Sequence, residues 1–444
     1  MTTRRPSPPT QRPGKASRNA RAPQARRGAA AGSCRPQGQQ HIVAGLFAGI
    51  GGLELGLHRS GHRTTLLCEN DPAAMAVLRH RFADIQLHDD VCRLERLPRE
   101  TSLVVAGFPC QDLSQAGSTR GIDGARSGLV GEVFRLIEKQ RVPWLLLENV
   151  PFMLQLARGE AMNVITSKLE DLGYRWAYRV IDARAFGLPQ RRRRVYLVAS
   201  LAGDPRSVLF ADRGDDVEEP VLNGHPIACG FYWTEGLRGL GWAVDAVPTL
   251  KGGSSIGIPS PPAILLPTGN VVTPHITDAE RLQGFRKNWT IAAESAGKRT
   301  ARWKLVGNAV SVPAAVWLGR RLRRPGKPLD FPSSDLRTGR AWPTAAWNVG
   351  QGRMHVLASE WPVRLAYRSL EALLGADLAP LSAKATRGFL SRAAVAKLRF
   401  PAGFIDALRV HEKRMSNPDA LTVRNHRYAF ATPDAAISAP CVRS

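Results

Sequence analysis

The pattern of apolar and polar residues after residue 40 predicts strands that alternate with helices. Short apolar runs bounded by turn residues are typical of buried strands, whereas longer amphipathic stretches are typical of helices. The predicted strands are Ile42–Leu46, Thr64–Cys68, Leu103–Ala106, Trp144–Leu147, Trp176–Ile181 and Val195–Ser200. The predicted helices are Leu53–Ser60, Pro72–Phe82, Leu129–Lys139, Ala161–Leu172, Ile276–Phe285 and Ala314–Arg323. This alternation indicates an α/β fold built on a doubly wound sheet.

Breaks in this pattern divide the chain into regions. Residues 1–40 hold eight Arg, one Lys and no acid, a composition that cannot bury a core and predicts a disordered basic tail. Residues 201–275 are rich in Gly and Pro without a clear helical period, so we expect an irregular region. The expected regions are a core over 41–200, the irregular region over 201–275, returning helices over 276–323 that complete the core, a linker over 324–340, and a separate, mainly helical module over 341–444.

The charge balance narrows the class of partner. The 444 residues include 62 Lys and Arg against 37 Asp and Glu, a formal net charge of +25. This excess favours a polyanion, with nucleic acid ahead of an anionic membrane surface. No apolar run is long enough to cross a membrane, and the basic N-terminus lacks the apolar core of a secretory signal. The six cysteines form no Cys-x-x-Cys pair and no metal site, so we expect a reduced, cytoplasmic protein.

A glycine-rich loop follows the first predicted strand. Residues 47–52 read FAGIGG, in which Gly49, Gly51 and Gly52 allow a sharp turn and the close approach of a ligand. Glu69 ends the second strand twenty residues later, where a carboxylate can accept hydrogen bonds from ribose hydroxyls. Together these features indicate a cofactor that contains adenosine.

Two reactive residue types follow the next strands. Cys110 lies on the loop GFPCQ directly after a strand, where Pro109 stiffens its approach, and a thiolate there is a strong nucleophile. Glu148 ends the apolar strand LLLE, and partial desolvation tends to raise the pKa of such a carboxyl into the range of acid–base work. The other cysteines are interpreted as structural.

Two further motifs accompany them. The run QRRRR at residues 190–194 leads into a strand, so its arginines alternate sides and only two of the four should point into the site. The run KLVGNAVSVP at residues 304–313 precedes an apolar helix, and its Gly-Asn turn could close over the cofactor.

Taken in this order, the motifs resemble those of the cytosine-5 DNA methyltransferase family. The similarity covers about residues 42–323, and the run ERLQGF at residues 280–285 resembles the helix that supports the family's target-recognition region. Two departures stand out: Arg286 occupies a position that is usually Pro, and the stretch between Arg194 and Pro248 is short for a target-recognition region.

The resemblance implies the mixed sheet of S-adenosylmethionine-dependent methyltransferases, with residues 201–275 as the target-recognition region. It implies that S-adenosylmethionine donates a methyl group to carbon 5 of a flipped-out cytosine in double-stranded DNA. In this interpretation Cys110 attacks carbon 6, Glu148 contacts the pyrimidine edge, and Arg192 and Arg194 orient the base and its phosphates. The residues that would bind the cofactor are Phe47 on the adenine, Glu69 on the ribose, Asp90 on the adenine amine, and Gly49, Gly51, Gly52, Pro109, Asn308 and Val310 around them.

Several alternatives stay open at this point. The same fold acts on transfer RNA in one branch of the family. A catalytically silent DNA-binding regulator is a second alternative, against which the intact Cys110 and Glu148 argue. The C-terminal module either adds DNA contacts or serves folding or assembly. Family habit alone suggests a cognate restriction endonuclease as partner. We also expect a monomer, no membrane association and no metal.

Overall fold

A computed structural model describes residues 38–109, 128–214, 227–237, 239–253, 260–297, 300–337 and 341–417. The predicted basic tail, except its last three residues, lies outside the described residues, and so does the predicted nucleophile Cys110.

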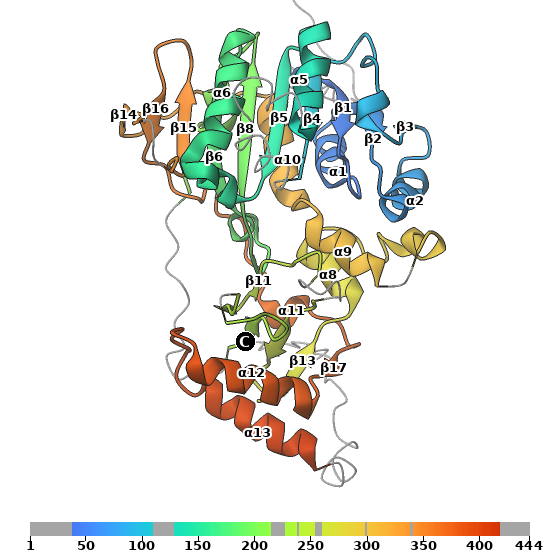
Figure 1. The fold of residues 1–444 in the computed structure, drawn as a ribbon, viewed down its shortest axis with the longest axis vertical. Coiled ribbons are helices and arrows are strands. Elements are labelled where there is room, and N and C mark those ends of the chain that lie inside the picture. Colours follow the sequence, from blue (N-terminus) through green and yellow to red (C-terminus); the bar gives the residue numbers. More distant parts are fainter. Residues whose placement is uncertain are drawn as a thin grey trace, which may run out of the picture. The chain divides into compact units, whose positions relative to one another are not determined.

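The described residues form a main sheet of ten strands in the order β14-β16-β15-β6-β8-β5-β4-β1-β2-β3 (Figure 1). The five strands from β5 to β3 pair in parallel, and the remaining pairs are antiparallel. Their bounds are β1 Ile42–Leu46, β2 Arg63–Cys68, β3 Gln86–His88, β4 Leu103–Ala106, β5 Trp144–Asn149, β6 Arg175–Asp182, β8 Arg193–Ser200, β14 Ser333–Asp335, β15 Ala345–Asn348 and β16 Met354–Val356. The mixed, doubly wound sheet is therefore confirmed.

Helices cover both faces of this sheet because its central strands are apolar on both sides. Along β1, Ala44 belongs to the cluster beneath α5 and α6, whereas Val43 belongs to the cluster beneath α1, α7 and α10. The helices around the main sheet are α1 Gly52–Arg59, α2 Pro72–Arg81, α5 Leu129–Gln140, α6 Glu160–Asp171, α7 Arg206–Leu209 and α10 Val312–Arg323. Short 3-10 helices join them: η1 Val91–Arg93, η2 Pro151–Leu154, η3 Leu156–Gly159 and η4 Ala183–Phe186.

A second sheet has the order β10-β9-β12-β13-β17 in the described chain. Its strands are β9 Cys229–Phe231, β10 Trp242–Val244, β12 Ala263–Leu265, β13 Val271–Thr273 and β17 Ala379–Pro380. A separate short pair joins β7 Gln190–Arg191 to β11 Val247–Pro248. Helices α8 Ile276–Leu282, α9 Ala301–Asn308 and α11 Leu370–Leu373 pack in one cluster beside this pair, and η5 Ile291–Ser295 lies between α8 and α9. The expected irregular region thus has a small sheet at its centre.

The C-terminal residues do not form one separate module, which corrects the sequence-based domain limits. Strand β15 pairs with β6, and β14 falls inside the predicted linker, so residues 333–356 extend the main sheet. Helices α12 Ala383–Val395 and α13 Phe404–Ser416 instead pack on the second sheet, with the rings of Phe231 and Phe389 4.7 Å apart. Strands β14, β15 and β16 are only three or four residues long, so they are too short to show a periodicity in the sequence.

Most core elements agree with their predicted bounds within one to three residues, including β1 and β4 without any difference. The core also runs past its predicted limit at residue 200, because Val208, Leu209 and Phe210 are buried under the main sheet. None of the helices in the described ranges combines the length and the apolarity that crossing a membrane requires.

Candidate active site

The glycine-rich loop turns sharply between β1 and α1. Phe47, Gly49 and Gly51 all have positive φ angles, of 53°, 55° and 78°. At Gly51 a Cβ atom would lie 2.3 Å from the Phe82 ring, so both its conformation and its surroundings require glycine. Gly51 then caps α1, and the loop presents its backbone at the carboxyl end of the sheet.

A cavity of about 350 Å³ opens at this end of the sheet. It is lined by most of the residues that the sequence assigned to the cofactor, together with the predicted acid: Phe47, Gly49, Gly52, Glu69, Asp90, Pro109, Glu148, Asn308 and Val310. Of the remaining predicted residues that the structure describes, Gly51 shapes the loop behind the cavity, and Arg192 and Arg194 lie outside its lining.

Glu69 ties the glycine-rich loop to the end of β2. Its Oε2 accepts a hydrogen bond from the backbone N–H of Gly49 at 2.7 Å, and its Oε1 accepts from Asn70 and Asp71 at 3.0 and 2.8 Å. Each oxygen of a carboxylate can accept more than one hydrogen bond. The Glu69 carboxylate, although fixed by the backbone, can therefore also accept hydrogen bonds from ribose hydroxyls.

Asp90 lies on the same wall of the cavity. Its Oδ1 accepts from the backbone N–H of Cys92 at 2.9 Å, which begins η1 and fixes the carboxylate. The cavity therefore offers apolar surface at Phe47 and Val310 and two oriented carboxylates. This combination suits an adenosine group, whose base is flat and whose sugar donates hydrogen bonds.

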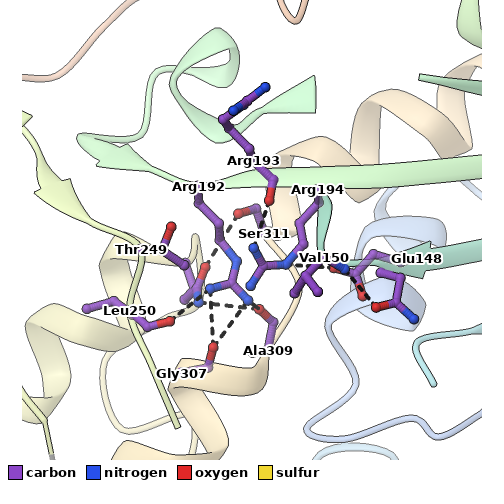
Figure 2. A network of polar contacts seen from close by, with 12 residues as sticks. Glu148, Val150, Arg192, Arg193, Arg194, Thr249, Leu250, Gly307, Ala309 and Ser311 are labelled. Carbon is purple, nitrogen blue, oxygen red and sulfur yellow. Dashed lines mark hydrogen bonds and ion pairs between the residues drawn. The ribbon is translucent and has the colours of Figure 1, made fainter. Parts of the chain in front are cut away.

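Glu148 is buried at the end of β5, with 8% of its surface exposed. Burial raises the pKa of its carboxyl, and the positive charges of Arg194 and Arg192 oppose that rise. The Nε of Arg194 lies 3.0 Å from Oε1 of Glu148 (Figure 2). A Cβ at Gly107 would lie 3.3 Å from Oε2, so the backbone that leads toward Cys110 passes close to this carboxyl.

Asn149 connects the acid strand to the loop before Cys110. Its Nδ2 donates to the carbonyl of Phe108 at 3.0 Å, and both partners are buried. Asn149 was not among the predicted site residues, although it directly follows Glu148 in the sequence. The bond fixes the end of β5 against the residues that follow β4.

The four arginines alternate sides, as the strand register predicted. Arg192 and Arg194 are buried, while Arg191 and Arg193 are exposed. Arg193 forms an ion pair with Glu360 on the outer side. The alternation is confirmed for the run as a whole.

The surroundings of Arg192 differ from the expected contact with the base. Its guanidinium donates to three main-chain carbonyls, of Leu250 at 3.1 Å, Gly307 at 3.2 Å and Ala309 at 2.6 Å (Figure 2). Burial lowers the pKa of Arg192 to about 9. Arg192 thus joins β11 to the end of α9, and it acts on the site through the segment that carries Asn308 and Val310.

Two glutamines reinforce this junction, and the sequence analysis assigned neither of them a role. Gln190 donates to Gln283 Oε1 at 3.1 Å and accepts from the backbone N–H of Leu250 at 3.0 Å. Gln283 donates in turn to the carbonyl of Val306 at 2.8 Å. The first residue of QRRRR and the glutamine of ERLQGF are therefore direct partners.

The predicted Gly-Asn turn is the last turn of a helix. Helix α9 continues to Asn308, and a Cβ at Gly307 would lie 2.1 Å from the backbone of Lys251. Gly307 is needed because two backbones meet there. Lys304, one turn earlier, pairs with Asp71 at 2.8 Å beside the cavity.

Glu54 is a cavity residue that the sequence analysis passed over. It lies in the first turn of α1, lines the cavity, and has 1% of its surface exposed. The available signal was an acid directly after the glycines, in a helix that begins Gly-Leu-Glu-Leu.

Comparison with known proteins adds to this geometry. The profile of the family described as C-5 cytosine-specific DNA methylase matches residues 42–220. The Type II methyltransferase M2.BsuMI of Bacillus subtilis (strain 168) is 52% identical over 367 residues, which cover 79% of this chain and 93% of that protein. M.MspI of Moraxella sp is 29% identical over 62% of this chain and 69% of that protein, and M1.ScrFI of Lactococcus lactis subsp. cremoris is 31% identical over 60% and 74%.

Proposed function

This chain belongs to the C-5 cytosine-specific DNA methylase family, and we propose that Cys110 and Glu148 carry its chemistry. It is a DNA cytosine-5 methyltransferase of the restriction–modification type, with S-adenosylmethionine as methyl donor. The transfer RNA alternative is disfavoured, because the relatives found over most of the chain are Type II methyltransferases.

The reaction requires activation of a cytosine that has left the base stack. Carbon 5 is a poor nucleophile until a group adds at carbon 6. We assign that addition to the Cys110 sulfur, which forms a C6–S bond and moves electron density toward N3 and carbon 5. When bound, S-adenosylmethionine supplies an electrophilic methyl group. Carbon 5 takes that methyl group, which leaves S-adenosylhomocysteine as the product. Loss of the proton from carbon 5 and cleavage of the C6–S bond then restore the aromatic ring and the Cys110 thiolate.

Glu148 would stabilise the charge that develops at N3. The single observation that carries this role is its position: a buried carboxyl, held by Arg194, in the same cavity as Pro109, the residue before Cys110. Because burial raises its pKa, Glu148 keeps a proton to higher pH than an ordinary carboxyl and can donate it toward N3.

The cofactor would bind along the glycine-rich loop. Phe47 would pack on the adenine, Glu69 would receive the ribose hydroxyls, and Asp90 would accept from the adenine amine. Their support is that all three line one cavity. Gly49, Gly51, Gly52, Pro109, Asn308 and Val310 would complete its walls.

Helices α12 and α13 would belong to the target-recognition region. They complete the core of the second sheet, which makes up for the short stretch between Arg194 and Pro248. The two helices and the segment between them expose Lys384, Arg387, Lys397, Arg399, Arg409, Lys413 and Arg414, of which Arg387 pairs with Glu412 and Arg409 with Asp406. This surface suits phosphate contacts with duplex DNA. A cytoplasmic monomer that works beside a cognate endonuclease completes the proposal.

Bisulfite sequencing of DNA from cells that express the protein tests the activity and reads the target together. In cells with wild-type protein, one cytosine of a single short sequence should resist bisulfite conversion wherever that sequence occurs. In cells with Cys110→Ser, no cytosine should resist conversion. Protection by Cys110→Ser would remove Cys110 from the mechanism. A wild-type protein that binds DNA and protects no cytosine would indicate a catalytically silent regulator.

A further inference from the structure

Glu54 is an acid in the cofactor cavity, and its carboxyl receives a hydrogen bond from its own backbone N–H but has no cationic partner among the described residues. Within the described part of the chain, its Oε2 is buried and has no hydrogen-bond partner. Its other oxygen faces β1, where a Cβ at Gly45 would lie 2.1 Å from Oε1. Gly45 therefore leaves the space that this carboxyl occupies, at the inner wall of the cavity.

The surroundings of Glu54 disfavour a negative charge. Burial raises its pKa to about 7, and the neighbouring Glu69 contributes to the rise. Strand β1 contributes no charged side chain, and the charged residues of α10 are Arg320, Arg321 and Arg323 in its last turn. The other charged or titratable side chains on α1 and around the cavity are His58, Arg59, Cys68, Asp71, Asp90, Glu148 and Lys304.

The positive charges around this cavity already have partners. Lys304 pairs with Asp71, and Arg194 pairs with Glu148. Among the described residues, Glu54 and Glu69 form no ion pair with a Lys, Arg or His side chain. A cation placed beside them would stabilise their negative charge and offset the desolvation of Glu54.

We propose that Glu54 pairs with the positive charge on the amino-acid end of S-adenosylmethionine, and that it releases its proton to solvent as the cofactor binds. This inference rests on the proposed function only in the identity of the cofactor. The positive charge comes from the sulfonium, the ammonium, or both. Before binding, the carboxyl is largely protonated below its pKa; after binding, the adjacent cation favours the carboxylate.

Calorimetric titration in buffers of different ionisation enthalpy measures the proton release directly. The titration is best made at about pH 6, because an α-amino group with a pKa of about 8 is then fully protonated and contributes no proton. Wild-type protein should release a large fraction of one proton per cofactor, and the release should fade above about pH 8, where Glu54 is already ionised. Wild-type protein that binds the cofactor without any proton release overturns the inference and leaves the proposed function intact.

Three variants test whether the proton released on cofactor binding comes from Glu54. Glu54→Gln should lose the release and bind the cofactor about tenfold or more weakly, a change of about 1.4 kcal/mol. Glu148→Gln should keep the release, although Glu148 is also a buried acid in the cavity. Glu138→Gln, at an exposed position on α5, is the matched control and should behave as wild type. Proton release that persists in Glu54→Gln, or that disappears in Glu148→Gln alone, overturns the inference.

Two further measurements separate pairing from a structural role. The apoprotein of Glu54→Gln should be at least as stable to heat as wild type, because an amide replaces a poorly solvated carboxyl. A less stable variant with unaltered proton release would make Glu54 a packing residue and overturn the inference. S-adenosylhomocysteine, which keeps the ammonium and lacks the sulfonium, identifies the charge: proton release with both ligands assigns the ammonium, and release with S-adenosylmethionine alone assigns the sulfonium.

Discussion

The guanidinium Nε of Arg194 lies 3.0 Å from the carboxylate oxygen Oε1 of Glu148, and both side chains are buried beside the cofactor cavity. The two residues come from β8 and β5, which pair antiparallel at the centre of the main sheet. The sheet therefore fixes the direction of the acid before any substrate arrives. Such a fixed acid is effective because little reorganisation is needed when charge develops on the base.

The pH dependence of methyl transfer should reveal this pair. If protonated Glu148 is the active form, the rate falls as the pH rises through its pKa. Arg194 holds that pKa down against the effect of burial. Arg194→Met should therefore raise the pKa and move the alkaline fall of the single-turnover rate to higher pH. Arg193→Gln, on the exposed side of the same strand, is the control. If the rate of Arg194→Met fell at the same pH as that of wild type, Arg194 would not control the pKa of Glu148.

Arg192 should matter for stability and for the cofactor segment. Arg192→Leu removes the side-chain donor to the carbonyls of Leu250 and Gly307 and leaves Ala309 with Gln283 as its side-chain donor, at a cost of about 1–3 kcal/mol in the free energy of unfolding. We expect lower thermal stability and weaker cofactor binding, measured by unfolding and by calorimetry. Arg193→Gln should change both by little, because exposed ion pairs are weak. An Arg192→Leu protein with wild-type stability and cofactor affinity would contradict the assigned role.

The contact between α9 and Lys251 should tolerate no added methyl group. Gly307→Ala places a Cβ against the backbone of Lys251, which overpacks the junction by about 1–3 kcal/mol although alanine is the better helix former. The matched control is Gly236→Ala, since a Cβ there meets no atom of the described residues within 4 Å. Chemical denaturation should separate the two variants. Equal free energies of unfolding for the two variants would contradict the prediction, because they would show that α9 and Lys251 can move apart to accommodate the added methyl group.

The C-terminal helices should affect DNA binding without affecting the cofactor. Phe389 lies on α12 and is fully buried, with the centroid of its ring 4.7 Å from that of Phe231 on β9. Phe389→Ala should destabilise the second sheet by about 3–5 kcal/mol. We expect weaker binding of duplex DNA in gel-shift titrations and an unchanged calorimetric affinity for S-adenosylmethionine. Loss of cofactor binding to the same extent would mean that the two sheets unfold together.

Sequence patterns predicted the elements with a continuous apolar face. Strand β4 is buried on both faces and appears in the sequence as a continuous apolar run, whereas helix α5 buries one face, so its helical periodicity is visible. Strands β14 to β16 were missed because their three or four residues fit any local conformation. Their place in the main sheet depends on pairing with β6, which lies more than 150 residues away in sequence.

In the candidate site, too, residues that belong to a local motif were predicted, whereas residues whose role depends on distant parts of the chain were not. Residues of the glycine-rich loop, Glu69 and Glu148 were found because each directly follows a predicted strand. The partners of Arg192 could not be found, because they are carbonyls, which every residue carries. Glu54 was missed because its importance depends on Gly45 and on burial, and neither is visible in a motif.

Covalent trapping tests the central claim most directly. The substrate is a pool of duplex DNA that contains 5-fluorocytosine. Fluorine replaces the proton that is normally lost from carbon 5, so an enzyme that has attacked carbon 6 stays covalently bound. With S-adenosylmethionine present, wild-type protein should form a complex that survives denaturation, and peptide mapping should place the DNA on Cys110. Cys110→Ser should form none while it still binds the cofactor. A complex mapped to another residue, or one that persists in Cys110→Ser, would contradict the account.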